Sequence, residues 1–233
     1  MFSWKQIFSI FVPLLFLVGI GSLGVWCTHH PKYFPVRVIE ISEALSHVSE
    51  ETIISAVSPH IDKGFFCLEI QAIQDSIAKL PWVVSSSVKR IWFDKIQIAL
   101  QEHTPQARFG ETGVMDTEGC VFYPEKNSIS EKLPLFKGPA EKAHEMLQQY
   151  YTVLESLGPL GLRVAELHLT AYGAWEIMLD NGIAIILGKT ALNERLTRFV
   201  LAYKLLLEAQ IVNIAYVDCR YTNGLAIGYK THA

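Results

Sequence analysis

The stretch from Gly182 to Thr190 comes closest to a chemical motif, because Gly188-Lys189-Thr190 resembles the end of a phosphate-binding loop. Such a loop has four residues between its two glycines, so that backbone N–H groups can wrap around a phosphate. Here five residues, Ile-Ala-Ile-Ile-Leu, separate Gly182 from Gly188. This apolar run is typical of a β-strand. We therefore expect Gly188 to end a strand and Thr190 to cap a helix, and we expect no nucleotide site.

Other candidate groups for chemistry also fail on spacing. Cys27, His29 and His30 are metal-ligating types, but no fourth candidate is nearby, and protein metal sites usually have three or four ligands. Glu102 and His103 are adjacent on an expected strand, where neighbouring side chains point to opposite faces. G-x-S-x-G and H-E-x-x-H are absent, and the four cysteines form no C-x-x-C pair. The sequence predicts no enzyme, cofactor, metal site or small-molecule substrate.

The segment from Ile7 to Cys27 contains no charged residue. About 20 apolar residues are enough for a helix to cross a bilayer. A cleaved signal peptide would have a shorter apolar region followed by small residues, and Val25-Trp26-Cys27 offers no such cleavage site. We predict a cytoplasmic tail at 1–6, a retained transmembrane helix at 7–27 and a connector at 28–35. The large C-terminal body favours a cytoplasmic N-terminus, although the flanking charges do not decide the orientation. A net charge of −3 shows no basic signature of nucleic-acid binding.

Residues 36–109 have the pattern of a small β-α-α-β-β domain. The hairpin is predicted from the apolar alternation of Ile96, Ile98 and Leu100, which is typical of a half-buried strand. Ser49 is expected to cap the first helix, and Pro81 to stop the second. The elements expected here are a strand at 36–41, a helix after Ser49, a helix from about 70 to 80, and strands at 84–92 and around 96–101. Large aromatic residues are mostly buried, so Trp82 and Trp92 are expected in the core.

Residues 110–233 are expected to form a second, sheet-rich domain with two helices. The first helix is predicted at about 140–157. Asp180-Asn181-Gly182 separates two alternating runs, which is a strong signal for a β-hairpin. A second hairpin is expected from Tyr216 to Lys230, with its turn at Asn223-Gly224. The fold class predicted for the whole chain is α+β, with a single N-terminal transmembrane helix.

Motifs spread over nearly the whole chain resemble the FtsQ/DivIB family of cell-division proteins. Each match is weak alone, but together and in order they are specific. They are Leu80-Pro81-Trp82, Ser87-Val88-Lys89-Arg90, Trp92, Glu102-His103, Pro105, Ala107-Arg108, Val114-Met115-Asp116, Glu118-Gly119, Leu133-Pro134, Arg195-Leu196, Arg198-Phe199, Tyr216-Val217-Asp218, Arg220-Tyr221 and Gly224.

The resemblance implies a POTRA domain (polypeptide-transport-associated) at 36–109, followed by a β domain at 110–233. It also implies a non-enzymatic scaffold of the bacterial divisome, placed in the inner membrane at the septum, which binds FtsB and FtsL and recruits later division proteins. A recruitment surface is implied on the last two POTRA strands, one of which should be a sheet edge. Its residues would be Ser85, Val88, Arg90 and Glu102.

The chain departs from the family pattern at three positions. Phe93 stands where a proline often follows the tryptophan, and Tyr229 replaces a tryptophan. Tyr172 stands where some members have an arginine thought to meet an acidic partner residue, so one ion pair at the partner interface would be missing.

We expect the last strand, around Leu225 to Tyr229, to lie at a sheet edge and to be covered by an added strand of FtsB. Tyr221 and Tyr229 would be aromatic anchors, and Arg198 and Arg220 would meet acidic partner residues. Gly224 would accept the positive φ of a tight turn. The expected partner-binding set is Arg198, Arg220, Tyr221, Gly224, Leu225 and Tyr229. A solvated strand face is the other interpretation of Arg220 and Tyr221, and both stay open.

Two other classes of function compete with a divisome scaffold. A POTRA-type periplasmic chaperone or translocation factor would handle unfolded chains by strand addition. Such proteins usually carry several POTRA repeats or a membrane barrel, and this sequence shows neither. A membrane-anchored enzyme is disfavoured because no catalytic constellation is evident.

Overall fold

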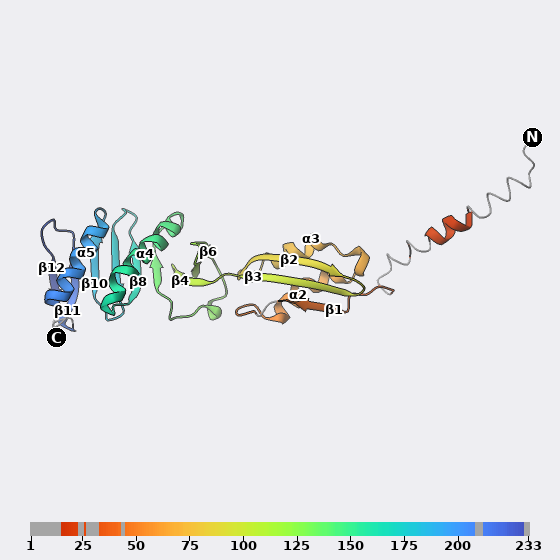
Figure 1. Ribbon diagram of the computed structural model, residues 1–233, viewed down its shortest axis with the longest axis horizontal. Helices are drawn as coiled ribbons and strands as arrows, with labels where there is room; N and C mark the ends of the chain where they lie inside the picture. Colours follow the sequence, from red (N-terminus) through yellow and green to blue (C-terminus); the bar gives the residue numbers. More distant parts are fainter. Residues whose placement is uncertain (1–14, 23–25, 27–32, 43–44, 208–211, 231–233) are drawn as a thin grey trace, which may run out of the picture. The chain divides into compact units, whose positions relative to one another are not determined.

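A computed structural model describes residues 15–22, 26, 33–42, 45–207 and 212–230 of the 233-residue chain (Figure 1). Residues 15–22 are helical. Over the stretches just given, no helix has the length and apolar character needed to cross a membrane. Most of the predicted 7–27 span and of the 28–35 connector lies outside these residues, as do Cys27, His29 and His30.

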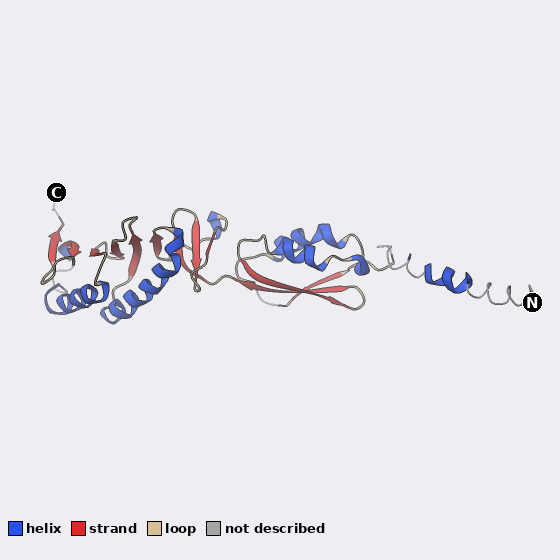
Figure 2. Ribbon diagram, turned by 90° about the horizontal axis from the view of Figure 1, so that it is seen from above, coloured by secondary structure: helices blue, strands red, loops and turns tan. Residues whose placement is uncertain are grey.

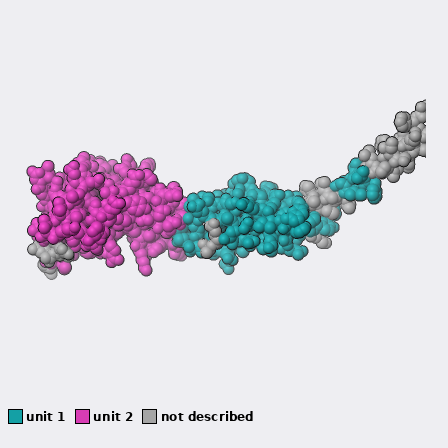
Figure 3. Space-filling model, in the orientation of Figure 1, with its two compact units in different colours: residues 1–102 teal, residues 103–233 magenta. Residues whose placement is uncertain are grey.

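The chain forms two compact units, residues 1–102 and 103–233 (Figure 3). The sequence placed the boundary after Phe109 instead. The difference concerns β4 (Pro105–Phe109), which pairs antiparallel with β5 (Gly113–Asp116) and parallel with β7 (Leu135–Lys137). These pairings place β4 in the sheet of the second unit.

The first unit has the predicted β-α-α-β-β order. Its sheet, in the described residues, has the strand order β1-β3-β2, with β1 parallel and β2 antiparallel to β3. Both helices lie on one face of this sheet (Figure 2). The elements are β1 (Val38–Ile41), α2 (Glu50–Ile61), a 3-10 turn (Phe65–Cys67), α3 (Ile70–Ile77), β2 (Val83–Ile91) and β3 (Lys95–Glu102).

Local signals explain where these elements begin and what they bury. The Ser49 hydroxyl accepts a hydrogen bond from the Thr52 N–H at 3.2 Å, which confirms the predicted cap of α2. The apolar faces of both helices pack on alternate residues of β3, because successive side chains of a strand point to opposite faces. The fully buried residues of this layer are Ile53, Val57, Ile73, Ile77, Ile96 and Ile98.

The second unit is one mixed sheet covered on one face by two helices (Figures 1 and 2). The strand order of its described residues is β12-β11-β10-β9-β8-β7-β4-β5-β6. The remaining strands are β6 (Val121–Phe122), β8 (Val164–Leu169), β9 (Trp175–Leu179), β10 (Ala184–Gly188), β11 (Ile214–Asp218) and β12 (Ala226–Tyr229), and the helices are α4 (Ala143–Leu157) and α5 (Leu192–Ala202). Shorter helical segments are Lys126–Ser128, Ala140–Lys142, Gly158–Leu160 and Tyr203–Leu207. The core between the layers includes Phe136, Met146, Leu157, Leu167, Ile177 and Phe199.

The two predicted hairpins are present, but their turns differ. Gly182 has φ +84°, as a tight turn between β9 and β10 requires. Strands β11 and β12 also pair antiparallel, yet a longer loop at 219–225 joins them. Gly224 has no positive φ, so the predicted reason for this glycine is wrong: the longer loop turns without a left-handed residue there.

The predicted start of α5 is also wrong in detail. Ala191, and not Thr190, precedes the helix, and it has a left-handed conformation with φ 53°. The Arg195 N–H donates to the Ala191 carbonyl at 3.0 Å, and no side chain caps this end. The helix is therefore opened by a backbone turn.

Candidate partner-binding surfaces

Strand β12 is an open edge of the second sheet, as Figure 1 shows. The Lys230 N–H donates inward to the Asn213 carbonyl at 2.8 Å, so alternation along the strand places the N–H groups of Tyr229 and Ile227 on the outer side. In the part of the chain that the structure describes, no strand pairs with that outer side. The strand contains no proline, a residue that often protects natural edges. This edge can accept another strand.

Exposed tyrosines surround this edge. Tyr221 is 58% exposed and Tyr229 is 57% exposed, so a partner can reach both rings. Tyr216 of β11 is also exposed, and its ring lies over Gly228 of the neighbouring strand. A Cβ atom at Gly228 would lie only 2.1 Å from Cε1 of Tyr216. Tyr216 was not in the predicted partner-binding set, although it lies in the motif that also contains Tyr221.

Two arginines of the predicted site hold the 219–225 loop. The buried carboxylate of Asp218 accepts hydrogen bonds from Nε of Arg220 at 2.9 and 3.0 Å and from Nη2 at 2.7 Å. These bonds lower the pKa of Asp218 and raise the pKa of Arg220. Arg198 donates to the Tyr221 carbonyl at 2.6 Å. Both arginines therefore hold the loop in place. The Arg220 side chain is still 59% exposed and can also contact a partner.

A third arginine, Arg195, lies beside these two and was not in the predicted partner-binding set, although it belongs to one of the quoted motifs. Its Nη1 donates to the Leu187 carbonyl at 2.5 Å, at the end of β10. Gly188, with φ +78°, makes room, because a Cβ there would lie 2.8 Å from Arg195 Nη1 and 3.1 Å from Arg220 Cγ. The available signal was the three-residue spacing of Arg195 and Arg198, which places both on one face of α5. Leu225, at the end of the same loop, is partly buried and packs against the core of the second unit.

The structure places the four predicted recruitment residues on β2 and β3 but not on one open surface. Strand β2 is an edge, as expected. The Ser85 hydroxyl donates to the Gln101 side chain at 3.2 Å, and the Arg90 guanidinium donates to the Leu68 carbonyl. Val88 is only 6% exposed because its side chain faces the helices. An Asp at Val88 would therefore disturb the fold.

Glu102 holds the segment that precedes α2. Its carboxylate accepts backbone hydrogen bonds from Ser46 at 2.9 Å, His47 at 3.2 Å and Val48 at 2.8 Å. Burial acts to raise the pKa of Glu102, but these N–H groups outweigh it and the pKa is lowered. The His47 ring stacks on Trp82 at 3.9 Å. Glu102 thus has a structural role within the first unit.

The expectations for the two tryptophans have different outcomes, and those for the Glu102–His103 pair and for metal ligands follow. Trp82 is 6% exposed, which confirms its place in the core, but Trp92 is 61% exposed and its predicted burial is wrong. Trp92 follows the end of β2, where its ring contacts Phe65, Phe66 and Phe93 and stays largely exposed. Glu102 and His103 do contact different partners, since His103 Nδ1 lies 2.7 Å from Asp116 Oδ2. Among the residues that the structure describes, no cluster of three His, Cys, Asp or Glu side chains could hold a metal.

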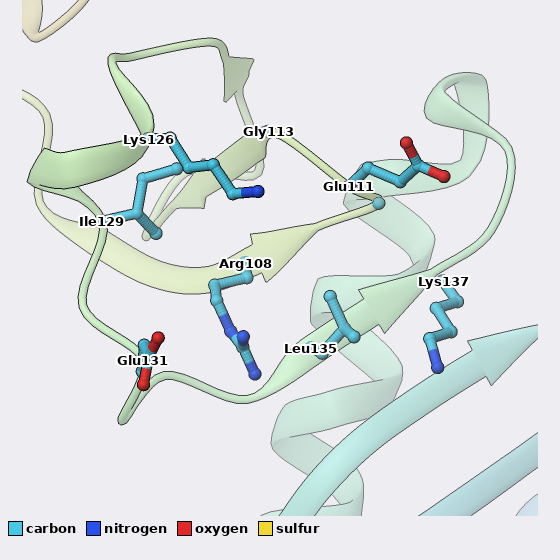
Figure 4. Close-up of a pocket in the computed structure, with 9 residues that line it drawn as sticks. Arg108, Glu111, Gly113, Lys126, Ile129, Glu131, Leu135 and Lys137 are labelled. Atoms are coloured by element: carbon cyan, nitrogen blue, oxygen red, sulfur yellow. The ribbon is translucent and has the colours of Figure 1, made fainter.

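A cavity of about 680 Å³ lies in the second unit, between β4, β7 and the segment after β6 (Figure 4). Arg108, Lys126 and Lys137 contribute positive charge, and Glu111 and Glu131 contribute negative charge. Lys137 forms an ion pair with Glu166 at 2.5 Å, and the Arg108 Nε donates to the Leu133 carbonyl at 3.1 Å. The mixed charge favours no ion of one sign. None of the predicted site residues lines this cavity.

Comparison with known proteins agrees with the division of the chain. Residues 34–103 match the FtsQ-type POTRA domain, and residues 104–220 match the C-terminal domain of cell division protein FtsQ/DivIB. Several relatives named cell division protein FtsQ match nearly the whole chain. The relative from Coxiella burnetii is 33% identical, covering 97% of this chain and 94% of its own. The relative from Shewanella oneidensis is 34% identical, covering 93% of this chain and 84% of its own.

The relative from Neisseria meningitidis is 30% identical, covering 95% of this chain and 93% of its own. Both domain matches follow each other without overlap and meet next to the boundary between the two compact units. The chain therefore belongs to the FtsQ/DivIB family of cell division proteins.

Proposed function

We propose that this protein is a scaffold of the bacterial divisome that links early and late division proteins at the septum. A helix at 7–27 anchors it in the inner membrane as a single pass, with a cytoplasmic N-terminus and a periplasmic C-terminal body. Its partners are FtsB and FtsL, and it catalyses no reaction. Family membership supports the division role, and the uncharged Ile7–Cys27 segment supports the anchor.

The open edge of β12 is the observation that carries the partner proposal. Its outward N–H and C=O groups offer main-chain hydrogen bonds to a short strand of FtsB, while side-chain pockets give specificity. The opposite edge of the same sheet is the two-residue β6, which offers far less backbone. The C-terminal end of the sheet is therefore the better place for strand addition.

Side chains next to β12 supply the specific contacts. Tyr221 and Tyr229 are exposed aromatic anchors, a residue type enriched at binding hot spots. The exposed part of Arg220 meets acidic partner residues. Lys189, whose Nζ lies 5.9 Å from the centre of the Tyr172 ring, provides a cation beside the position where some family members have an arginine.

Binding of an FtsB peptide to the full chain tests this proposal. Tyr221→Ala removes one anchor and should cost about 2 kcal/mol, or about 30-fold in dissociation constant. Ile227→Pro removes an outward N–H donor and should also abolish strand addition. Tyr123→Ala is the matched control, because Tyr123 is 61% exposed and directly follows β6, the opposite edge strand of the sheet, and its loss should leave affinity unchanged.

Two outcomes would contradict the proposal. An unchanged dissociation constant for both Tyr221→Ala and Ile227→Pro would show that FtsB binds elsewhere. A fluorescent fusion that labels the envelope uniformly, with no midcell band in dividing cells, would contradict the septal role.

The membrane anchor is tested separately. Protease added to spheroplasts should digest the C-terminal body, and the intact chain should resist alkaline extraction from the membrane. A soluble product shortened near Cys27 would overturn the anchor.

A further inference from the structure

An exposed aromatic patch lies at one end of the first unit. We define it as Tyr33, Phe34, Phe66, Trp92 and Phe93. Tyr33, Trp92 and Phe93 are 54%, 61% and 64% exposed. Four of the rings form a row of contacts, with centroids 5.0 Å apart for Phe34 and Phe66, 5.6 Å for Phe66 and Trp92, and 4.9 Å for Trp92 and Phe93. Large exposed apolar patches usually mark an interaction site.

This patch lies where the chain enters the first unit. The Phe65 N–H donates to the Phe34 carbonyl at 2.8 Å, and the Arg37 N–H donates to the Asp94 carbonyl at 2.8 Å. The second bond ties the entering chain to the connection between β2 and β3, which carries Trp92 and Phe93. The patch thus combines the first residues of the unit with the tip of its hairpin.

The length of chain before the patch limits its distance from a membrane. The uncharged segment ends at Cys27, and a residue of a fully extended chain spans at most about 3.6 Å, so Phe34 lies within about 25 Å of that end. The Trp26 ring, next to the end of the segment, has its centroid 6.1 Å from that of Tyr33. The headgroup region of a bilayer begins at this end and is several ångströms thick.

We propose that the aromatic patch docks into the headgroup region of the lipid bilayer and holds the first unit against the membrane. This inference rests on the anchor of the proposed function. Trp and Tyr favour the membrane–water interface because each combines an apolar ring with a polar group. Arg37 and Lys95 are exposed next to the patch and can meet lipid phosphates, whereas Lys63 is paired with Glu69 at 2.5 Å.

Tryptophan fluorescence of the full chain in phosphatidylcholine vesicles tests this docking. One set of vesicles contains lipid brominated near the headgroups, which quenches nearby indole rings. The emission difference between the wild type and Trp92→Phe isolates the signal of Trp92. Trp175→Phe is the matched control, because Trp175 is 3% exposed in the core of the second unit.

We expect the Trp92 signal to fall about twofold or more in brominated vesicles, because an interfacial side chain lies within about 10 Å of the bromines. The Trp175 signal should not change. A chain that fails to float with the vesicles would overturn the anchor and the docking together. A chain that floats with an unquenched Trp92 would overturn the docking alone, and a blue-shifted but unquenched Trp92 would show that protein covers the patch instead.

Discussion

Replacing Glu102 by Ala tests whether this residue stabilises the fold or only presents a surface for recruitment. The substitution removes the acceptor of three backbone N–H groups, at Ser46, His47 and Val48. A hydrogen bond to a charged group contributes about 1.5–3 kcal/mol. The N–H groups of Ser46 and His47 lie at the surface and can turn to water, whereas that of Val48 is partly buried. We therefore count about one full bond and expect a loss of about 2–3 kcal/mol.

Hydrogen exchange of the full chain measures this loss within the first unit. Because 1.4 kcal/mol is tenfold in an equilibrium, amide exchange in peptides from α2 and β3 should accelerate about 30- to 150-fold. Glu40→Ala is the matched control, since Glu40 is an exposed glutamate on β1 of the same sheet and should change stability by less than about 0.5 kcal/mol.

The effect should depend on pH in a defined direction. The folded pKa of Glu102 lies below its ordinary value of 4.5, so its stabilising effect is complete above pH 4.5 and is lost as pH falls through the folded pKa. The difference between wild type and Glu102→Ala should therefore shrink in acid. Equal exchange rates for Glu102→Ala and Glu40→Ala at neutral pH would refute the reasoning. Glu102 would then have no stabilising role, and a role in the recruitment surface would be favoured.

Three other substitutions or reagents test features of the fold. Val88→Asp should unfold the first unit, at a cost of about 3 kcal/mol or more for a buried charge, and a circular-dichroism spectrum identical to wild type would contradict this. Gly182→Ala, at φ +84°, should lower the free energy of unfolding by about 1–2 kcal/mol, while Gly224→Ala should change it by less than about 0.5 kcal/mol. Equal urea midpoints for the two variants would contradict the expected backbone strain at Gly182. Burial raises the pKa of Cys219 to about 12, so iodoacetamide at pH 8 should label the exposed Cys120 and leave Cys219 unmodified, and equal labelling by mass spectrometry would contradict the structure.

Local patterns in the sequence were enough to predict most elements. Period-two alternation located β3, β9 and β10, and Ser49 located the start of α2, because these signals depend on residues that are neighbours in the chain. The choice of sheet for Pro105–Phe109 depended on its parallel pairing with β7, which begins at Leu135. No signal within the strand itself reveals such a distant partner.

The same limit applies to the candidate sites. The edge position of β12 and the exposure of Tyr221 and Tyr229 agree with the expectations drawn from the sequence. The hydrogen bonds of Arg198 and Arg220 could not be predicted, because they depend on how the 219–225 loop folds back over α5 and β11. Trp92 lies just after β2 and is 61% exposed, a result of tertiary packing that its residue type does not reveal.

The parallel pairing of β1 and β3 has a mechanical consequence. The chain enters this sheet at the N-terminal end of β1 and leaves for the second unit at the C-terminal end of β3. Because the two strands run in the same direction, tension between these two ends would slide them past each other. Sliding loads all the hydrogen bonds between the strands at once, whereas peeling would break them one after another. A force applied between these two ends of the first unit is therefore resisted by all the β1–β3 hydrogen bonds together.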